Sequence, residues 1–241
     1  MSIMYSLEQQ LSVMQLTGKD ALVFINNQII NNFEHNSKQP HYSAICNPKG
    51  RIIFSLLMWQ HDEIIFMAID KSLSEEFKQY INMRRFRMDV KLTDANNYTP
   101  VVTDIDNDFV KDITLSASPD HKPLSSSNFW QIFFRSNLPW ITKESSEQFI
   151  PQHLSLDQHQ LIEYQKGCYP GQEIIARLHF IGRNKKQLAL IQLNQQDNYK
   201  NGGQVTINDI KGQLCSPAIE IDNQLTAQIV KNIAVKPDLK D

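Results

Sequence analysis

The stretch HYSAICNPKGRIIFSLLMWQHDEIIFMAID, residues 41–70, contains the densest apolar run of the chain and predicts the centre of its fold. Two apolar runs are joined by Asn47-Pro48-Lys49-Gly50, a tetrapeptide typical of a tight turn. A third apolar run, DEIIFMAI, follows. We therefore predict three consecutive β-strands, the last two over residues 51–59 and 63–69.

The residues that follow this stretch predict a helix and a further strand. KSLSEEFKQYINM carries apolar side chains at helical spacing, and Ser72 and Glu75 have the spacing of a capping box. Charged and apolar residues alternate over 85–92. This period of two is typical of a strand with one buried face and one solvent-exposed face. Strands on both sides of a helix in this order indicate half of a ferredoxin-like α+β unit.

The remaining segments predict the outer parts of the fold. GKDALVFINNQIINNF predicts a helix over about residues 19–32 with Thr17 as its N-cap. Residues 94–128, rich in Asn, Asp, Ser and Pro, predict an extended connection. FWQIFFRSNLPW predicts a short helix that ends near Pro139. Beyond Lys185, short apolar runs separated by Gly, Asn and Asp predict a small β-domain.

Composition limits the class of protein. A chain of 241 residues is long enough for two or three modest domains. Its net charge of −2 gives no overall attraction to nucleic acid or to a membrane, so any such contact must be local. The N-terminus has no pattern of a secretory signal, and no apolar run reaches 18 residues. These features predict a cytoplasmic protein without a membrane partner.

The three cysteines are Cys46, Cys168 and Cys215, and no two of them form a CxxC pair. An odd number at wide spacing argues against a disulfide framework and against a self-contained zinc site. The same count argues against an iron–sulfur cluster held by this chain alone, because the usual ligand set is four thiolates. We therefore predict no metal ligands.

Residues 166–173, KGCYPGQE, predict a sharp turn that leads into a helix. Gly167 and Gly171 lie on either side of Cys-Tyr-Pro, a composition that favours a tight change of chain direction. QEIIARLHF, residues 172–180, then predicts a helix, and Glu173 lies favourably at the positive end of its dipole.

Cys168 has two interpretations. It lies just ahead of the predicted helix and two residues from Lys166, and both neighbours stabilise a thiolate. The alternative is a small buried side chain in a tight turn, which the spacing by itself favours. A Cys-His nucleophilic site also stays open, because His153, His159 and His179 are near in sequence.

Positive charge gathers in two places although the chain as a whole is slightly acidic. Each cluster could receive a carboxylate-rich ligand or phosphates, and the alternative for each is a solvated face. The first cluster contains Lys166, Arg177, Arg183, Lys185 and Lys186, and the second contains Arg84, Arg85, Arg87 and Lys91.

Residues 149–188, around KGCYPGQE, resemble the signature region of the YgfZ proteins, the folate-binding, tRNA-modifying relatives of the glycine cleavage T-protein. Three upstream stretches are also similar to that family: LTGKDALVFINNQIINNF, CNPKGRIIFSL and FWQIFFRSNLPW. The resemblance covers about residues 7–190.

The resemblance implies an α+β protein with a three-domain T-protein-like fold. The first domain would be discontinuous, folate-binding, and formed by 1–47 and 113–183. The second, 48–112, would be ferredoxin-like, and the third, 184–241, a small β-barrel. The resemblance also implies that the chain binds tetrahydrofolate or a derivative. Its implied partners are the iron–sulfur enzymes that modify tRNA by thiomethylation, with direct contact to tRNA as a further expectation.

The same resemblance implies roles for individual residues. Cys168 becomes a functional thiol near the folate. Trp130 matches one of the family's two folate-contacting tryptophans, and the other falls near Leu11, which can pack but offers no indole. The residues expected to attract the glutamate tail of the folate are Lys166, Arg177 and Arg183. The residues expected to shape and order the turn are Gly167, Tyr169, Gly171, Gln172 and Glu173.

One departure from the family limits the expected chemistry. Phe54 and Ser55 stand where the T-protein has its catalytic aspartate, and neither replaces a carboxylate. We therefore do not predict aminomethyl transfer. Two alternatives stay open: a folate-dependent one-carbon transferase, which needs an acid or base elsewhere, and a non-enzymatic scaffold that contacts an iron–sulfur enzyme or tRNA.

Overall fold

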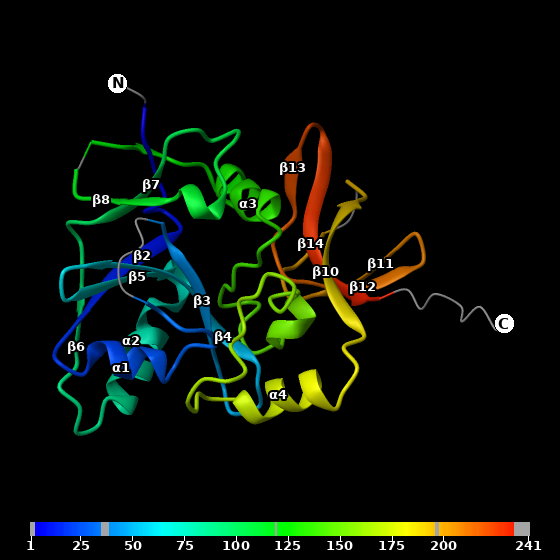
Figure 1. Cartoon of the computed structure of the whole chain (residues 1–241). Coiled ribbons are helices and arrows are strands. Elements are labelled where there is room, and N and C mark those ends of the chain that lie inside the picture. The colour runs from blue at the N-terminus through cyan, green and yellow to red at the C-terminus, as the bar shows by residue number, and fades with distance from the viewer. Residues whose placement is uncertain (1–2, 35–38, 119, 196–197, 234–241) are drawn as a thin grey trace.

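The computed structural model describes residues 3–34, 39–118, 120–195 and 198–233. Over these residues the chain is a mixed α+β protein with three β-sheets and four α-helices (Figure 1). None of these helices combines the length and the apolar character needed to cross a bilayer.

The central sheet is antiparallel throughout, in the order β3-β4-β5-β2-β6. Its strands are β2 (Leu11–Thr17), β3 (His41–Cys46), β4 (Ile52–His61), β5 (Ile64–Asp70) and β6 (Lys91–Asp94). The three strands predicted from residues 41–70 are therefore confirmed as β3, β4 and β5. The predicted turn joins β3 to β4, where Gly50 adopts a φ of +71° and its N–H donates to the Asn47 carbonyl at 2.9 Å.

The order of elements around this sheet is that of a ferredoxin-like unit. β2, α1 (Ala21–Asn26), β4, β5, α2 (Ser74–Arg84) and β6 give the β-α-β-β-α-β succession, and β3 is added at the edge. This sheet crosses the boundary predicted at residue 47, because β2 pairs between β5 and β6. The expected second domain, 48–112, holds only part of it, and the division into three domains stays a prediction.

The first helix is shorter than predicted. α1 covers Ala21–Asn26 rather than 19–32, and its N-cap is Asp20 rather than Thr17. Beyond the helix, Ile29 lies in an isolated β-bridge and is fully buried. The apolar residues after α1 are thus buried by extended chain, although their spacing also fits a helix.

The strand predicted over 85–92 is wrong for its first six residues. The chain turns directly after α2, and Arg87 has a left-handed φ of 61°. The Arg85 guanidinium donates to the Val90 carbonyl at 2.6 Å, so a side chain holds the turn. Only the last part of the alternating pattern joins the sheet, as β6.

The predicted capping box of the second helix is also wrong. A short 3₁₀ helix, η1 (Lys71–Leu73), precedes α2, and Asp70 caps it by accepting from the Ser72 N–H at 3.0 Å. No side-chain cap is present at the start of α2 itself. The carboxylate that ends β5 therefore takes the capping role.

Residues 94–128 form more than the expected connection. They supply three strands of a four-stranded sheet in the order β8-β7-β1-β9 and the short helix η2 (Val110–Asp112). The strands are β1 (Tyr5–Ser6), β7 (Thr99–Val102), β8 (Thr114–Ser116) and β9 (Lys122–Pro123). Strands this short carry too few residues for their periodicity to be recognised.

Three helices follow this sheet. α3 (Ser126–Arg135) confirms the helix predicted from FWQIFFRSNLPW, although it ends at Arg135 and not near Pro139. Its N-cap Ser125 accepts from the Asn128 N–H at 3.1 Å. η3 (Pro151–Leu154) is a short 3₁₀ helix. α4 (Gln172–Phe180) has the bounds predicted for it.

The C-terminal sheet follows α4. Its strands are β10 (Lys186–Leu193), β11 (Gln204–Ile207), β12 (Ile210–Leu214), β13 (Ile219–Ile221) and β14 (Gln224–Asn232). The order is β10-β14-β12-β11, and β13 also pairs with β14. A barrel closes only when its edge strands pair, and the ladders of the described strands leave β10 and β11 unpaired to each other. This sheet is therefore open, in contrast to the expected β-barrel.

Candidate functional site

A cavity of about 590 Å³ lies where the start of β2, the end of β5, α3 and the C-terminal segment meet; we call it the α3 cavity. Its volume is within the range of about 300–1,000 Å³ that is usual for small-molecule sites. The cavity is lined by Gln9, Gln10, Asp70, Lys71, Ser72, Ser126, Phe129, Trp130, Thr142, Glu144, Lys200, Asn201 and Pro217.

Asp70 is a buried carboxylate of this cavity. Its Oδ1 accepts hydrogen bonds from the backbone N–H and the hydroxyl of Ser72, and its Oδ2 accepts from Trp140 Nε1 at 3.2 Å. Burial raises the pKa of Asp70, against the lowering effect of these hydrogen bonds. A carboxylate offers about four acceptor positions, so it can still accept from a ligand.

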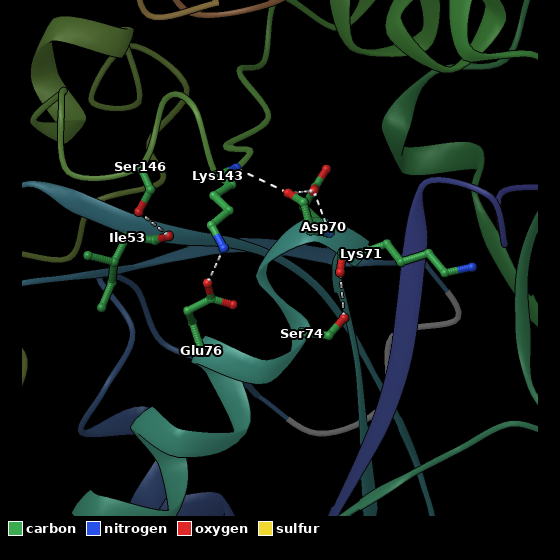
Figure 2. A network of polar contacts seen from close by, with 8 residues as sticks. Ile53, Asp70, Lys71, Ser74, Glu76, Lys143 and Ser146 are labelled. Atoms are coloured by element: carbon green, nitrogen blue, oxygen red, sulfur yellow. Dashed lines mark hydrogen bonds and ion pairs between the residues drawn. The ribbon is translucent and has the colours of Figure 1, made fainter.

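Neighbouring segments hold Asp70 in place from several sides. Asp70 is the register partner of Leu11 in the pairing of β2 with β5. The Lys71 N–H donates to the Gln10 carbonyl at 2.8 Å. The Ser72 hydroxyl, which donates to Asp70, accepts from the backbone N–H of Lys143 at 3.1 Å. Figure 2 shows Asp70 and Lys143 close to each other in this network. The carboxylate is thus positioned before any ligand arrives.

The apolar part of the cavity comes from α3. Phe129 and Trp130 line it, and their ring centroids lie 5.5 Å apart in an edge-on arrangement. Lys71, whose Nζ donates to the Glu8 carbonyl at 3.2 Å, and Lys200 add positive charge to the same lining. The cavity therefore combines two largely buried aromatic rings, two cations and two carboxylates, Asp70 and Glu144.

The two positions expected to contact folate are brought near each other. Trp130 lines the α3 cavity, whereas Leu11 lines a neighbouring cavity of about 240 Å³. Lys71 lines both cavities, and Leu11 pairs with Asp70 across the strands. Leu11 therefore lies beside Asp70 but does not line the α3 cavity.

Phe54 and Ser55 are both buried and do not line the α3 cavity. The Phe54 ring packs edge-on against Phe77 and Tyr80, with centroids 5.1 and 5.6 Å away. The Ser55 hydroxyl accepts from the Ile141 N–H at 3.2 Å. Both residues thus serve the core.

Asp70 was missed by the reasoning from sequence, which placed it at the boundary between a strand and a helix. A usable signal was present: an acidic residue directly ends an apolar strand and precedes Lys-Ser. Such a position places a carboxylate at the end of a strand, but only the tertiary structure shows that Asp70 and α3 line the same cavity.

The KGCYPGQE segment packs against the turn between β3 and β4. Gly171 has a φ of +81°, and a Cβ atom there would lie 2.5 Å from the Asn47 carbonyl oxygen and 2.6 Å from the Gly50 Cα. Gln172 Nε2 donates to the Lys166 carbonyl at 3.2 Å, and Tyr169 is buried. Glu173 lies exposed in the first turn of α4.

Lys166 is bound to backbone rather than free. Its Nζ donates to the carbonyls of Ile29 and Asn31 at 3.0 and 2.5 Å and lies 5.6 Å from the Tyr169 ring centroid. Burial lowers the pKa of Lys166 to about 8. These contacts connect the KGCYPGQE segment to the chain that follows α1.

The structure does not bring the remaining predicted residues to the α3 cavity. Cys168, Gly167, Arg177 and Arg183 are exposed and are not part of its lining. Figure 1 shows α3 in the upper part of the view and α4 at the bottom, so the KGCYPGQE segment lies away from Trp130.

No group of three or more His, Cys, Asp or Glu side chains within the described part of the chain could hold a metal ion. All three cysteines are free thiols. Burial raises the pKa of the Cys46 and Cys215 thiols, which therefore stay protonated.

Comparison with known sequences identifies several relatives that are named YgfZ. The tRNA-modifying protein YgfZ of Blochmanniella pennsylvanica is 26% identical over 238 residues, which cover 80% of this chain and 72% of that protein. The YgfZ protein of Klebsiella pneumoniae is 30% identical over 154 residues, 57% of this chain and 43% of its own length. An Escherichia coli YgfZ protein is 32% identical over 130 residues, which cover 48% of this chain and 37% of that protein. No family model matches the chain.

Comparison with solved structures identifies the fold. The glycine cleavage system aminomethyltransferase T from Bartonella henselae superposes with a TM-score of 0.68 over 96% of this chain and 78% of that one. The sequences are 9% identical, so the match shows a T-protein fold and nothing more.

Proposed function

Because the chain is a relative of the YgfZ proteins and has the fold of a glycine cleavage T-protein, we propose that it is a folate-binding protein of tRNA modification. In this proposal it assists iron–sulfur enzymes in the cytoplasm. The observation that carries the proposal is the α3 cavity, where Trp130 and the carboxylate of Asp70 line the same volume.

The residues of the α3 cavity fit the chemistry of a folate. Asp70 has acceptor capacity for the N–H edge of a pterin, and Phe129 and Trp130 supply flat apolar surface. Lys71 and Lys200 supply positive charge for the carboxylates of the glutamate tail. When bound, tetrahydrofolate supplies one-carbon or reducing chemistry, and the chain's residues bind it, orient it and exclude water.

We accordingly revise the expected tail-binding residues. In the revised proposal the tail is bound by Lys71 and Lys200. Lys166 is set aside because its Nζ donates to two carbonyls. Arg177 and Arg183 are set aside because they lie outside the cavity lining. Cys168 keeps its proposed role as a functional thiol. Because it is exposed and outside this cavity, we assign its thiol to contacts with a partner enzyme.

Titration of tetrahydrofolate against tryptophan fluorescence tests folate binding. We expect a saturable change at tens of micromolar ligand, about 6 kcal/mol of binding free energy. Trp130→Phe should remove most of the signal change. Trp59→Phe, at a buried position in β4 outside the cavity lining, should keep it. Absence of any saturable change in the unmodified protein would end the folate proposal.

Asp70→Asn tests the orientation of the ligand. Loss of the carboxylate should weaken tetrahydrofolate binding about 10- to 100-fold, the range expected for a hydrogen bond to a charged group. The matched control is Asp62→Asn, an exposed carboxylate at the turn before β5. Equal affinity of the two variants would exclude Asp70 as the anchor of the pterin edge.

The buried carboxylate also favours a second candidate function, a folate-dependent one-carbon transferase. Such an enzyme needs an acid or base beside the ligand, and Asp70 with its raised pKa supplies one although Phe54 and Ser55 do not. Turnover of an aminomethyl or formyl donor in the presence of tetrahydrofolate measures this activity. The candidate is discarded if turnover is absent or is unchanged in Asp70→Asn.

The role in iron–sulfur-dependent modification is tested in cells. A strain that lacks this protein should contain less thiomethylated tRNA, measured by mass spectrometry of nucleosides. The unmodified protein should restore the level, and Asp70→Asn and Cys168→Ser should not. Full restoration by Cys168→Ser would show that the exposed thiol has no part in this role.

A further inference from the structure

A second surface lies on α4 and the chain that follows it. We call this surface, which shares no residue with the lining of the α3 cavity, the α4 face; it consists of Ile174, Arg177, His179, Phe180, Ile181, Arg183, Lys185 and Lys186. Phe180 and Ile181 are 66% and 81% exposed. Large apolar side chains that lie open together on a surface commonly mark a contact site.

Helical spacing places these side chains on one side of α4. Ile174 precedes Arg177 by three residues, and Phe180 and Ile181 follow it by three and four. Ile175 supplies the buried side of the helix. The apolar side chains of the α4 face are therefore exposed by the position of the helix.

Aromatic rings gather at the C-terminal end of α4. Tyr164 and His179 stack with ring centroids 3.8 Å apart and an angle of 15° between their planes. Phe180 lies edge-on to both, at 5.9 and 4.7 Å. The end of the helix thus presents a compact group of flat rings.

Positive charge surrounds these rings. Residues 177–186 contain four cations, Arg177, Arg183, Lys185 and Lys186, and no acidic residue. None of the four takes part in an ion pair found within the described residues, and the nearest carboxylate on α4, Glu173, is at its opposite end. Among the described residues, therefore, no carboxylate forms an ion pair with the cations of the α4 face.

The positively charged surface continues from the end of α4 to the start of β10. Arg183 and Lys185 line one pocket together with Ile233. Lys186 also acts on the half-buried side chain of His153. Burial and then the charges of Lys186 and Arg51 lower the pKa of His153 to about 4. The cations after α4 thus form one positive region.

The other basic cluster of the sequence is occupied by its own contacts. The Arg84 guanidinium lies 3.8 Å from the Tyr80 ring centroid, and Arg85 donates to the Val90 carbonyl. Arg87 lies 5.1 Å from the Phe86 ring centroid. These arginines stabilise the end of α2 and the turn after it.

We propose that the α4 face binds a single-stranded stretch of RNA. Bases stack on Phe180 and on the His179–Tyr164 pair, and the four cations contact phosphates. Exposed rings within a positive surface are how proteins bind single strands without sequence preference. A protein partner is disfavoured, because four cations with no acid among them match a polyanion.

This inference does not depend on folate binding. It rests on the proposed role in tRNA modification in one respect, the choice of RNA as the polyanion that the α4 face binds. The test uses the full chain and two probes: unfractionated tRNA and a fluorescein-labelled single-stranded RNA of about 15 nucleotides. Fluorescence anisotropy is measured between 50 and 300 mM salt. We expect affinity to fall steeply as salt rises, because each neutralised phosphate releases counterions.

Two variants and two matched controls locate the contact. Phe180→Ser should weaken binding about 10-fold, as expected for the loss of one base stack. Arg183→Ala with Lys185→Ala should lower the salt slope by about 1.4, the value for two phosphate contacts on a single strand. The controls lie outside the α4 face: Phe86→Ser, at a 75% exposed ring, and Arg87→Ala with Lys111→Ala.

The possible outcomes distinguish an RNA site on the α4 face from a protein site there and from no site. Loss of binding in the α4 variants, with the controls unchanged and all variants folded by circular dichroism, supports the proposal. No RNA binding, or equal losses in variants and controls, overturns it. Retention of RNA binding by variants that lose an iron–sulfur enzyme partner would reassign the α4 face to a protein. The tetrahydrofolate titration stands apart from these outcomes, so failure of either proposal leaves the other standing.

Discussion

Gly171 and Gly50 decide how the KGCYPGQE segment meets the rest of the chain. Both have positive φ, and a Cβ at Gly171 would lie 2.6 Å from the Gly50 Cα. Gly171→Ala should lower the free energy of unfolding by about 2–3 kcal/mol, from backbone strain and overpacking against backbone atoms. Chemical denaturation followed by circular dichroism measures this change.

Gly167→Ala is the matched control within the same segment. A Cβ at Gly167 would meet no atom within 4 Å. Its effect should stay within about 0.5 kcal/mol, as for most surface substitutions. Similar losses at the two positions would show that the close approach at Gly171 does not stabilise the fold.

The raised pKa of Asp70 predicts that the free energy of unfolding depends on pH. Burial raises its pKa above the ordinary value of 3.8, so the unfolded chain loses this proton first as the pH rises. The contribution of Asp70 to folding is therefore greatest below about pH 3.8 and is lost as the pH rises through the folded-state pKa. The difference in unfolding free energy between the unmodified protein and Asp70→Asn should fall over that window. A difference that does not change with pH would contradict the raised pKa.

The three thiols should differ in reactivity. Cys168 is exposed, whereas Cys46 and Cys215 are fully buried and have raised pKa values. Iodoacetamide should therefore modify one thiol per folded chain and three after denaturation, as counted by mass spectrometry. Modification of Cys46 or Cys215 in the folded protein at the rate of Cys168 would be inconsistent with their burial.

At the scale of elements, α3 is the helix that positions the apolar wall of the α3 cavity. Its first turn is fixed by Ser125, whose hydroxyl accepts from the Asn128 N–H. Ser125→Ala should cost about 1 kcal/mol of unfolding free energy, the usual value for the loss of an N-cap. Ser126→Ala, at an exposed position one residue later, is the control and should be close to neutral. Equal thermal stability of the two variants would count against the cap.

The elements also show which sequence patterns are reliable. Long apolar runs predicted β3, β4 and β5 correctly, because a strand buried on both faces needs a continuous apolar sequence. Alternation over 85–92 failed, because the contact between Arg85 and the Val90 carbonyl holds a turn there. A hydrogen bond of this kind, from a side chain to the backbone, does not produce a periodic pattern in the sequence.

At the scale of the whole molecule, the C-terminal sheet shares its core with the rest of the chain. Leu188, Cys215 and Val230 belong to the same buried cluster as the central sheet. A smaller cluster, which includes Leu214 and Ile229, packs within the C-terminal sheet itself. Unfolding of this sheet should therefore be coupled to the remainder.

Gln228 tests that coupling. It is fully buried in β14, and its Nε2 donates to the Leu138 carbonyl at 3.0 Å. Gln228→Ala leaves that carbonyl without its donor and should cost about 1–3 kcal/mol. Gln224→Ala, exposed at the start of the same strand, should have little effect.

The readout is tryptophan fluorescence, because all three tryptophans precede residue 184. If the fluorescence transition of Gln228→Ala kept its midpoint while circular dichroism shifted, the two parts would unfold separately and the coupling would be refuted.

Part of the candidate site could be predicted from the sequence. KGCYPGQE predicted the turn and the bounds of α4, because glycine positions and helix signals act over a few residues. Trp130 was singled out by resemblance, and it does line a cavity. Asp70 could not be found in this way, since its role comes from α3 and residues 142–144, which are distant in sequence.

The sequence by itself determined the strands β3, β4 and β5, the helices α3 and α4, and the resemblance to YgfZ proteins. Local apolar patterns and a long mixed motif are properties of adjacent residues. Only the tertiary structure decided that Asp70 and Trp130 line one cavity while Cys168 and Arg177 lie outside its lining. It also decided that β2 pairs between β5 and β6, across a boundary expected at residue 47. The physical reason is that strand order and cavities arise from long-range packing, which brings together side chains whose spacing along the chain has no period.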